Sequence, residues 1–446
     1  MLSEDGTELR ETELGSIPKD WKVLEIKDVC ILKAGSAFSK KLQGKSSGHY
    51  PFIKVSDMNL PNNSKFINNA NNWIEAVDAK NTRAKIHTAG AVVFAKIGIA
   101  LTYNRRRILK RETIIDNNMM SATPKEGNID ASYMYFLFCT IDFNKIACGT
   151  ALPYLNTNDI YRIKTATPPL TEQRSIAKFL SDLDSKIEIN QRMNQTLETI
   201  GQAVFKRWFV DFEFPNEEGK PYKSSGGELV DAGEIGKKIP KGWKIGRIED
   251  VADVVGGGTP STKIESYFTN TGIHWLTPRD LSGFEGKFID KGATDITEEG
   301  LKNSSAKLMP KGAILFTSRA PIGYVAIALN SITTNQGFKS LIPKNKMQTE
   351  YLYQYLRMIT PYIQSISCGS TFGEISGKAM KGIRITIPER LMVEKFEELM
   401  APVNLRIINN MFGVRTLKEI RDSLLPRLMS GRIRIPVEER TADNRK

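Results

Sequence analysis

Two pairs of adjacent amide side chains stand at equivalent places in the two halves of this 446-residue chain, Asn117 with Asn118 and Asn335 with Gln336. Each pair follows a predicted strand. An Asn or Gln amide can form two hydrogen bonds with adenine in the major groove of DNA, and an Arg guanidinium can form two with guanine. Three further side chains of the second half could contact bases in the same way: Thr277, Arg279 and Arg319. Asn more commonly forms turns, so base contact and turn formation both remain open for these residues.

Basic residues indicate that the partner is a polyanion. The chain carries 63 Lys and Arg against 50 Asp and Glu, a net charge of +13, and its pI is near 9.3. Lys and Arg neutralise phosphates without reporting base sequence. Charge governs association rather than fold, and basic composition without such a role is also common. The densest clusters lie in the first half, and we predict that they bind DNA: Lys40, Lys41 and Lys45, and Arg105, Arg106 and Arg107.

Catalytic patterns are missing from the sequence. Lys378 is followed by Ala379 instead of Ser or Thr, which excludes a P-loop, and the glycines at 256–258 predict a turn rather than a dinucleotide site. Asp20 with Glu25 and Lys27 imitates part of a metal-dependent nuclease, and so does Asp280 with Glu285 and Lys287. A solvated charge pair is the better interpretation of both. The four Cys form no CxxC pair and the three His are scattered. We therefore predict no catalytic residue, no metal site and no disulfide framework.

Segments of the chain recur about 220 residues apart. The pentapeptide at 17–21 returns at 239–243, and the strand-like run at 89–94 returns at 311–316. The Cys-Gly-Thr at 148–150 matches Cys-Gly-Ser at 368–370. A repeat of this length is too long for a solenoid, so we expect two similar domains. Short β-branched runs alternate irregularly with helical segments, which indicates an α+β fold for each.

Each half ends in a long amphipathic segment with apolar residues three or four apart, which predicts a long helix of about 60 Å. Asparagines interrupt both apolar stripes at the same place, Asn190 and Asn410. An Asn in an apolar seam can fix register when it meets its counterpart, or it can face solvent, and both remain open. Pro402 predicts a kink or a delayed start in the second helix. We predict that the two helices pair antiparallel through the following residues: Ile176, Leu180, Leu183, Ile187, Asn190 and Leu197 with Val403, Ile407, Asn410, Leu417 and Leu424.

These patterns divide the chain into six parts. The predicted fold class is α+β, with two similar globular domains separated by two long antiparallel helices in a pseudo-twofold arrangement. A polar, Gly- and Ser-rich connector is expected to be flexible. No membrane span or leader is visible, so we expect a cytoplasmic protein. The predicted parts are a first domain at 1–168, a first helix at 169–210, the connector at 211–235, a second domain at 236–388, a second helix at 389–430 and a tail at 431–446.

Several motifs resemble the specificity subunit of type I restriction-modification enzymes. The Thr-Pro-Arg-Asp segment at 277–280, the run at 314–323 and the Thr-Asn-Gln-Gly-Phe at 334–338 are similar to its target-recognition domain. The Pro-Pro-Leu-Thr-Glu-Gln-Arg at 168–174 that leads into a helix is also typical, as are 225–229 and 424–431. The resemblance covers essentially the whole chain. The first half departs from the pattern, with Ile-Lys-Val-Ser-Asp at 53–57.

This resemblance implies two target-recognition domains, each recognising one half of a split DNA target. It implies a non-catalytic subunit that brings two methyltransferase (M) subunits, which use S-adenosylmethionine to methylate adenine N6. In the complete enzyme it also implies restriction (R) subunits that use ATP and Mg, so none of these cofactors is expected on this chain. Two alternatives are an adaptor that binds only proteins and a stand-alone methyltransferase or nuclease.

Overall fold

The computed structural model of the chain describes residues 8–435, apart from 61, 150, 234–237, 285, 320, 346–347 and 368–372. The chain divides into two compact units. Unit 1 comprises Met1–Ile187 with Thr416–Lys446, and unit 2 comprises Glu188–Arg415. The repeated motif at 368–370 and the predicted boundary between 235 and 236 lie outside the described residues. Among the residues that are described, no helix is long and apolar enough to cross a membrane.

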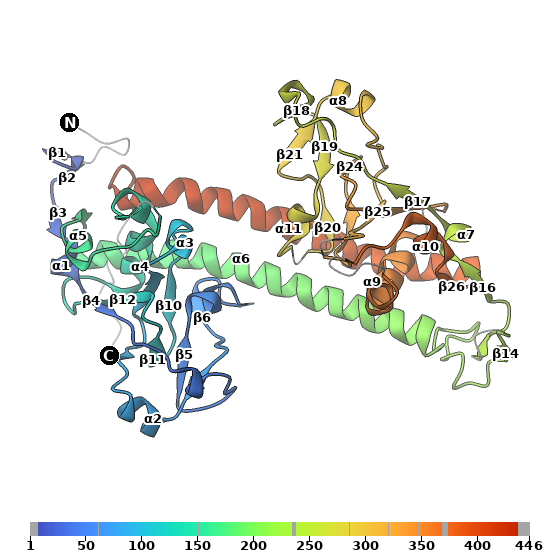
Figure 1. Cartoon of the computed structure of the whole chain (residues 1–446), viewed down its shortest axis with the longest axis horizontal. Helices are drawn as coiled ribbons and strands as arrows, with labels where there is room; N and C mark the ends of the chain where they lie inside the picture. Colours follow the sequence, from blue (N-terminus) through green and yellow to red (C-terminus); the bar gives the residue numbers. More distant parts are fainter. Residues whose placement is uncertain are drawn as a thin grey trace, which may run out of the picture. The chain divides into compact units, whose positions relative to one another are not determined.

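Unit 1 contains two main sheets (Figure 1). The first has five strands in the order β4 (Cys30–Ala34), β12 (Met119–Pro124), β9 (Val92–Ala95), β10 (Arg107–Leu109) and β6 (Phe66–Ile67). The second has four in the order β7 (Trp73–Ile74), β5 (Tyr50–Ile53), β11 (Thr113–Ile115) and β8 (Ile86–His87). Two pairs complete the unit, β1 (Leu9–Thr12) with β2 (Gly15–Pro18) and β3 (Lys22–Glu25) with β13 (Lys164–Thr167). Its short helices are α1 (Ile26–Val29), α2 (Ala76–Asn81), α3 (Ile99–Thr102), α4 (Ala131–Thr140) and α5 (Thr157–Tyr161).

Unit 2 repeats this plan. Its five-stranded sheet has the order β17 (Ala252–Gly256), β25 (Lys339–Pro343), β22 (Ile314–Phe316), β23 (Val325–Ala328) and β20 (Phe288–Ile289). The second sheet has the order β18 (Phe268–Thr269), β21 (Thr294–Ile296), β19 (Ile273–Leu276) and β24 (Thr333–Thr334). The pairs are β14 (Leu229–Asp231) with β15 (Lys238–Pro240) and β16 (Lys244–Arg247) with β26 (Arg384–Ile387). Its short helices are α7 (Ile248–Val251), α8 (Glu298–Lys302), α9 (Thr349–Ser365) and α10 (Gly377–Gly382).

The repeat seen in the sequence is therefore also a repeat of strand pairing. In each five-stranded sheet the first four strands are antiparallel and the last pair is parallel, β10 with β6 and β23 with β20. Trp21 and Trp243, from the repeated pentapeptide, are both buried in the core of their own unit. The two predicted similar domains of α+β class are confirmed.

Two long helices carry the apolar stripes, α6 (Leu170–Phe205) and α11 (Arg390–Met429). A π-helical turn, Lys206–Val210, follows α6. In Figure 1 they are the long green and red helices, and each continues from one unit into the other. Pro402 lies twelve positions after the start of α11, so the predicted delay of this helix start is wrong.

The two helices pair within each unit. In unit 1, Arg421 of α11 donates from Nη1 to Asp184 of α6 at 3.0 Å, and Ile176 and Leu180 are fully buried with Leu428. In unit 2, Phe205 of α6 lies 6.2 Å, between ring centroids, from Phe396 of α11. None of the residues predicted to pair the helices is exposed.

The Asn residues of the seam lie inside it. Asn190 and Asn410 are both buried. Asn410 Nδ2 donates to Asn194 Oδ1 at 2.9 Å, and Asn194 Nδ2 donates to Ile407 O at 3.1 Å. Neither alternative from the sequence holds for Asn410, because its partner is Asn194 rather than its repeat counterpart. Since α6 runs from Asn194 to Phe205 while its partners run back from Asn410 to Phe396, the pairing in unit 2 is antiparallel.

Much of the segment expected to be a flexible connector is folded onto unit 2. Phe214 is buried and stacks on Trp243 with ring centroids 5.2 Å apart and on Tyr222 at 4.6 Å. Glu213 accepts the Ser224 amide at 3.1 Å, which closes the segment into a loop. Its polar composition predicted mobility, but two aromatic residues anchor it to the core.

Candidate nucleic-acid interface

Four loops of unit 2 meet where strands β17, β19, β22 and β24 end. The Asn335 amide donates to Leu276 O at 2.8 Å, which joins the loop after β24 to the loop after β19. The Ser318 amide donates to Gly337 O at 2.7 Å, which adds the loop after β22. We call residues 257–259, 277–279, 318–319 and 335–337 loop cluster 2. It contains all the site residues predicted in the second half: Thr277, Arg279, Arg319, Asn335 and Gln336.

Glycines allow the loop after β17 to approach the others. A Cβ at Gly257 would lie 2.0 Å from the Asn335 carbonyl oxygen, and one at Gly258 would lie 2.3 Å from Ser305 Oγ. Gly258 also donates its amide to Thr334 O at 2.8 Å and accepts Trp275 Nε1 at 3.0 Å. At Gly257 and Gly258 the predicted turn is thus a close approach to neighbouring segments that only glycine permits, whereas Gly256 ends β17 with open space around it.

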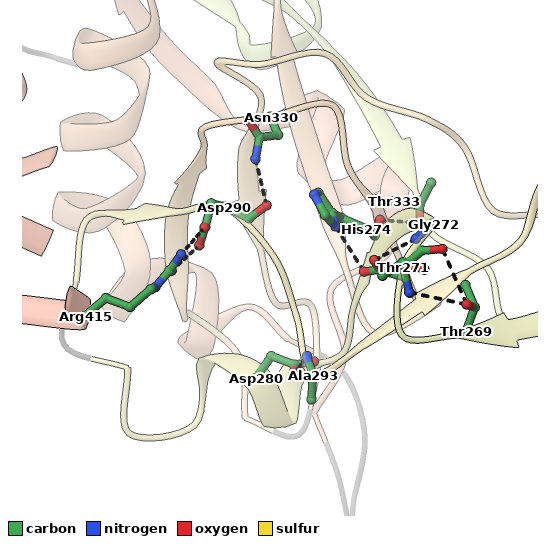
Figure 2. A network of polar contacts seen from close by, with 11 residues as sticks. Thr269, Thr271, Gly272, His274, Asp280, Asp290, Ala293, Asn330, Thr333 and Arg415 are labelled. Carbon is green, nitrogen blue, oxygen red and sulfur yellow. Dashed lines mark hydrogen bonds and ion pairs between the residues drawn. The ribbon is translucent and has the colours of Figure 1, made fainter. Parts of the chain in front are cut away.

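Asp280 holds the loop after β19 in place. Its Oδ2 accepts the Thr277 amide and the Thr277 hydroxyl, both at 2.7 Å. Its Oδ1 accepts the Ala293 amide at 2.9 Å, as Figure 2 shows. The Thr277 hydroxyl donates its proton to this carboxylate, so Thr277 stabilises the turn, as a residue of a capping box does. Arg279, in the same turn, is exposed.

The two amides of the loop after β24 have different roles. Asn335 Oδ1 accepts the Gly337 amide at 2.9 Å, so Asn335 forms a turn. Gln336 is exposed, and its Oε1 accepts the hydroxyl of Thr259 across the cluster. Arg319 Nη1 lies 3.9 Å from Glu374 Oε2 and remains half exposed. Gln336, Arg279 and Arg319 are therefore the side chains of this cluster that can extend to a ligand.

Unit 1 has the same arrangement at the ends of β4, β5, β9 and β11. The Asp116 amide donates to Ile53 O at 2.9 Å, and the Lys96 amide donates to Asn118 O at 2.8 Å. A Cβ at Gly35 would lie 2.1 Å from the Asp116 carbonyl oxygen, as at Gly257 in unit 2. We call residues 35–36, 54–56, 96–97 and 116–118 loop cluster 1.

These contacts correct the predicted equivalence of the amide pairs by one residue. Asp116 Oδ1 accepts the Asn118 amide at 2.6 Å, which is the turn that Asn335 makes in unit 2. Asp116 therefore corresponds to Asn335, and Asn117 corresponds to Gln336. Asn117 and Asn118 are both exposed. The repeat in the sequence misplaced them because the turn takes either Asp or Asn as its acceptor.

The lysines predicted to bind DNA lie in an exposed segment next to loop cluster 1. Lys40 and Lys41 form a short 3-10 turn, Lys40–Leu42, and are exposed. The neighbouring Gln43 accepts Lys54 Nζ at 2.6 Å, and Lys54 belongs to the cluster. Lys45 Nζ lies 3.2 Å from Asp78 Oδ2 at the surface.

Arg106 is buried inside unit 1, so its predicted DNA contact is wrong, whereas Arg107 is half-buried and its predicted contact stays a prediction. Arg106 is 3% exposed, donates to Ile141 O at 2.8 Å and lies 3.9 Å from the centroid of the Phe143 ring. Burial lowers the pKa of its guanidinium to about 10. Arg107 donates to the carbonyls of Met58 at 3.1 Å and of Arg106 at 2.7 Å. Both side chains satisfy backbone oxygens inside unit 1. Arg105 stays at the surface, half exposed, with its guanidinium 4.5 Å from the centroid of the Tyr103 ring.

Sequence reasoning overlooked several cations that lie at the clusters. Lys54 and Lys96 of loop cluster 1 occupy the positions of Thr277 and Ser318. In unit 2, Lys378 and Lys381 of α10 lie beside Lys339. A strict application of the repeat would have found Lys54 and Lys96, whereas nothing in the local sequence marks the two lysines of α10.

The imitation of a nuclease site is also resolved. Lys287 is 1% exposed and pairs with the buried Glu350, so the predicted solvated charge pair is wrong. Asp280 is occupied by the loop contacts above. Glu285 lies outside the described residues. Among the described residues, no group of three or more His, Cys, Asp or Glu could hold a metal ion.

An ion pair joins the segment after β20 to α11. Arg415 donates from Nη1 and Nη2 to both carboxylate oxygens of Asp290, at 2.7 and 2.8 Å, and Figure 2 shows this two-bond contact. The hydrogen bonds from Arg415 hold the pKa of Asp290 below its usual value. Asp290 O accepts Asn330 Nδ2 at 3.2 Å, which extends the contact to the turn before β24. A charge-assisted contact thus joins α11 to the segment after β20, and a neutral hydrogen bond links that segment to the turn before β24.

Comparison with known proteins decides what these clusters belong to. The chain matches the family described as Type I restriction modification DNA specificity domain over residues 18–199 and 240–399. The chain belongs to this family. The two matched segments coincide with the two copies of the repeat.

Individual specificity subunits are also similar to most or nearly all of this chain. One from a type I restriction enzyme of Methanocaldococcus jannaschii is 29% identical over 443 residues, which cover 96% of this chain and 97% of the relative. Another, from Haemophilus influenzae, is 24% identical over 376 residues, 72% of this chain and 81% of the relative. The crystal structure of the S subunit from M. genitalium aligns with a TM-score of 0.55 at 14% identity, covering 96% of this chain and 99% of that one, and so shows the same fold. The predicted family is confirmed, and with it the prediction of a DNA specificity subunit rather than an enzyme or a protein-only adaptor.

Proposed function

We propose that this specificity subunit recognises a two-part DNA target, with loop cluster 1 at one half-site and loop cluster 2 at the other. The observation that carries the proposal is the pair of equivalent clusters, each with an exposed amide at the same position, Asn117 and Gln336. Such an amide can form two hydrogen bonds with an adenine. Basic side chains near each cluster supply the phosphate contacts that set affinity.

The two half-sites should differ in sequence, because the clusters share a backbone and differ in side chains. Where cluster 2 has Thr277 and Arg279, cluster 1 has Lys54 and Ser56. Arg279 suits a guanine, whereas a Ser hydroxyl accepts several bases. The target is therefore expected to be asymmetric.

The complex that we propose contains two M subunits and, in its full form, R subunits. The chain directs them to the target and performs no chemistry itself. S-adenosylmethionine would be held by the M subunits, and ATP and Mg by the R subunits. We expect the complex to act in the cytoplasm, where it can reach the host DNA.

The test is to express the chain with its M subunits and to sequence the methylated adenines in the host DNA. The parent should give one two-part motif. Asn117→Ala should relax base preference in one half of that motif and Gln336→Ala in the other, each by about 1–3 kcal/mol of discrimination. A parent that yields no motif, or two variants that alter the same half, would refute the proposal.

A further inference from the structure

Three lysines surround an open hollow at the surface of unit 2. Its floor is formed by β17, and its sides by β25 and α10. It is lined by Val254, Gly256, Lys339, Gly377, Lys378 and Lys381.

The hollow is continuous with loop cluster 2. Gly256 precedes the glycines at 257–258, and Lys339 follows the loop at 335–337 by two positions. The Ile375 amide, two residues before Gly377, donates to Ser318 O at 3.1 Å. A ligand in the hollow would therefore lie beside whatever the cluster binds.

Positive charge dominates the hollow. Lys378 and Lys381 are exposed, and no carboxylate lies within salt-bridge distance of either among the described residues. Lys339 Nζ is 3.5 Å from Glu374 Oε1, and the same carboxylate lies 3.9 Å from Arg319 Nη1. Among the described residues, Glu374 is thus the one carboxylate within 4.0 Å of any of these four cations, and it pairs only with Lys339 and Arg319. Cations gathered around a concave surface attract an anion and raise its local concentration.

Unit 1 shows that the fold does not require this hollow. The positions of Lys378 and Lys381 are occupied there by Asn158 and Tyr161, on the equivalent helix α5. The Tyr161 hydroxyl accepts the Leu32 amide at 3.0 Å, and Leu32 corresponds to Val254 in the floor. Tyr161 therefore covers in unit 1 the strand that is open in unit 2.

We propose that Lys339, Lys378 and Lys381 bind a backbone phosphate of the DNA next to the half-site of loop cluster 2. The inference rests on the proposed function and adds an anchor that nothing in the sequence motifs indicates. A phosphodiester carries its charge on two unesterified oxygens, which suit lysines acting as point charges. The contact holds the duplex in register without selecting a base. Because Tyr161 covers the equivalent strand of unit 1, this particular contact belongs to the half-site of loop cluster 2.

The first experiment measures binding of the full chain, assembled with its M subunits, to a duplex that carries its motif, at increasing KCl. Lys378→Ala/Lys381→Ala should lower the slope of log affinity against log salt by about one, the contribution of one phosphate. The two plots, for the parent and for the variant, meet at one salt concentration. For each tenfold reduction in salt below that concentration, the variant should bind roughly tenfold more weakly relative to the parent. The preference for the motif over altered half-sites should stay the same. An unchanged slope, or a changed half-site preference, would overturn the proposal.

Two matched controls separate a local phosphate site from a general effect of net charge. Lys307→Ala/Lys311→Ala makes the same change in charge at exposed positions before β22, at the opposite strand end from Ser318. Asn158→Ala alters the equivalent position of Lys378 in unit 1. Both should keep the parent slope. An equal loss in Lys307→Ala/Lys311→Ala would show that net charge alone sets the slope and would refute a local site.

A second experiment locates the phosphate. Single methylphosphonate substitutions, which remove the charge of one phosphate, are scanned along the duplex. At one position beside the second half-site the parent should lose roughly tenfold in affinity, and Lys378→Ala/Lys381→Ala should lose nothing further. Inorganic phosphate at constant ionic strength should not compete. Competition that disappears in the variant would indicate a free-phosphate site instead and would overturn the assignment to DNA. A parent that binds no duplex at all would refute the proposed function itself, whereas binding without such a position refutes only this inference.

Discussion

Replacement of Lys287 by methionine should destabilise unit 2 by about 3–5 kcal/mol, the usual cost of leaving a buried charge without its partner. Lys287 Nζ donates to the carboxylate of Glu350 and to Asn404 Oδ1 at 2.7 Å. The side chains of Lys287 and Glu350 are 0% and 1% exposed. These three residues come from the segment before β20, from α9 and from α11, so the ion pair joins the sheet to both helices.

The carboxylate would keep some hydrogen bonds after the replacement. Glu350 accepts Gln354 Nε2 at 2.8 Å and Asn404 Nδ2 at 2.9 Å. These neutral donors do not balance a full charge, and Glu397 lies against the same helix end, with its Oε1 accepting the Tyr351 amide at 3.2 Å. Methionine has a similar length to lysine, so little of the loss should come from a cavity. Neutralising both partners in Lys287→Met/Glu350→Gln should recover most of the stability.

Hydrogen exchange of peptides from α9, measured at increasing urea, reports the opening free energy of unit 2 without assuming that the whole chain unfolds in one step. Lys302→Met is the matched control, because Lys302 is 78% exposed and lies 4.0 Å from Glu298, and it should change stability by less than about 0.5 kcal/mol. The reasoning fails if Lys287→Met stays within about 1 kcal/mol of the parent, or if the double variant is no more stable than the single one.

Three further outcomes are expected. Gly257→Ala should abolish methylation that depends on loop cluster 2, because its Cβ would lie 2.0 Å from the Asn335 oxygen, whereas Gly382→Ala, with nothing within 4 Å, should leave it intact. Burial raises the pKa of Glu397 to about 8, so the folded chain keeps a proton that the unfolded chain releases near its usual value. The stability of unit 2 should therefore fall as pH rises from about 5 to 8, and melting curves of Glu397→Gln should lack this trend. Arg106→Met should lower the stability of unit 1 by about 1–3 kcal/mol while the salt slope of DNA binding stays unchanged, and a reduced slope would return Arg106 to the interface.

Features that show as a regular spacing or a repeat along the chain could be predicted from the sequence. The apolar spacing in the two long segments indicated α6 and α11, because a helix of 3.6 residues per turn brings such positions to one face. The run at 313–316 indicated a strand in the same way, since its β-branched and aromatic residues suit a pleated, buried surface. The repeated pentapeptide indicated that Trp21 and Trp243 hold equivalent places, and the structure shows each buried in the core of its own unit. The resemblance then led to the family that the comparisons confirm.

Tertiary structure alone decided which polar groups face the solvent. Arg105, Arg106 and Arg107 are identical residues in one run, yet the fold buries only Arg106 against the Phe143 ring. A run of basic residues does not indicate which of them will lie near backbone carbonyls in the folded chain. Lys287 was likewise interpreted as solvated, although Glu350, 63 residues away, receives it in the core.

The tertiary structure alone also decided which distant loops meet. The hydrogen bond from Asn335 to Leu276 joins residues that are far apart in the chain, and strand pairing rather than local propensity brings them together. Lys378 and Lys381 belong to the short helix α10, which carries no recognisable motif. Only the fold shows that they lie beside the uncovered strand β17. The sequence by itself therefore determined the repeat, the helices and the family. The folded chain determined the two loop clusters and the lysine hollow, because these depend on contacts between segments that no local pattern encodes.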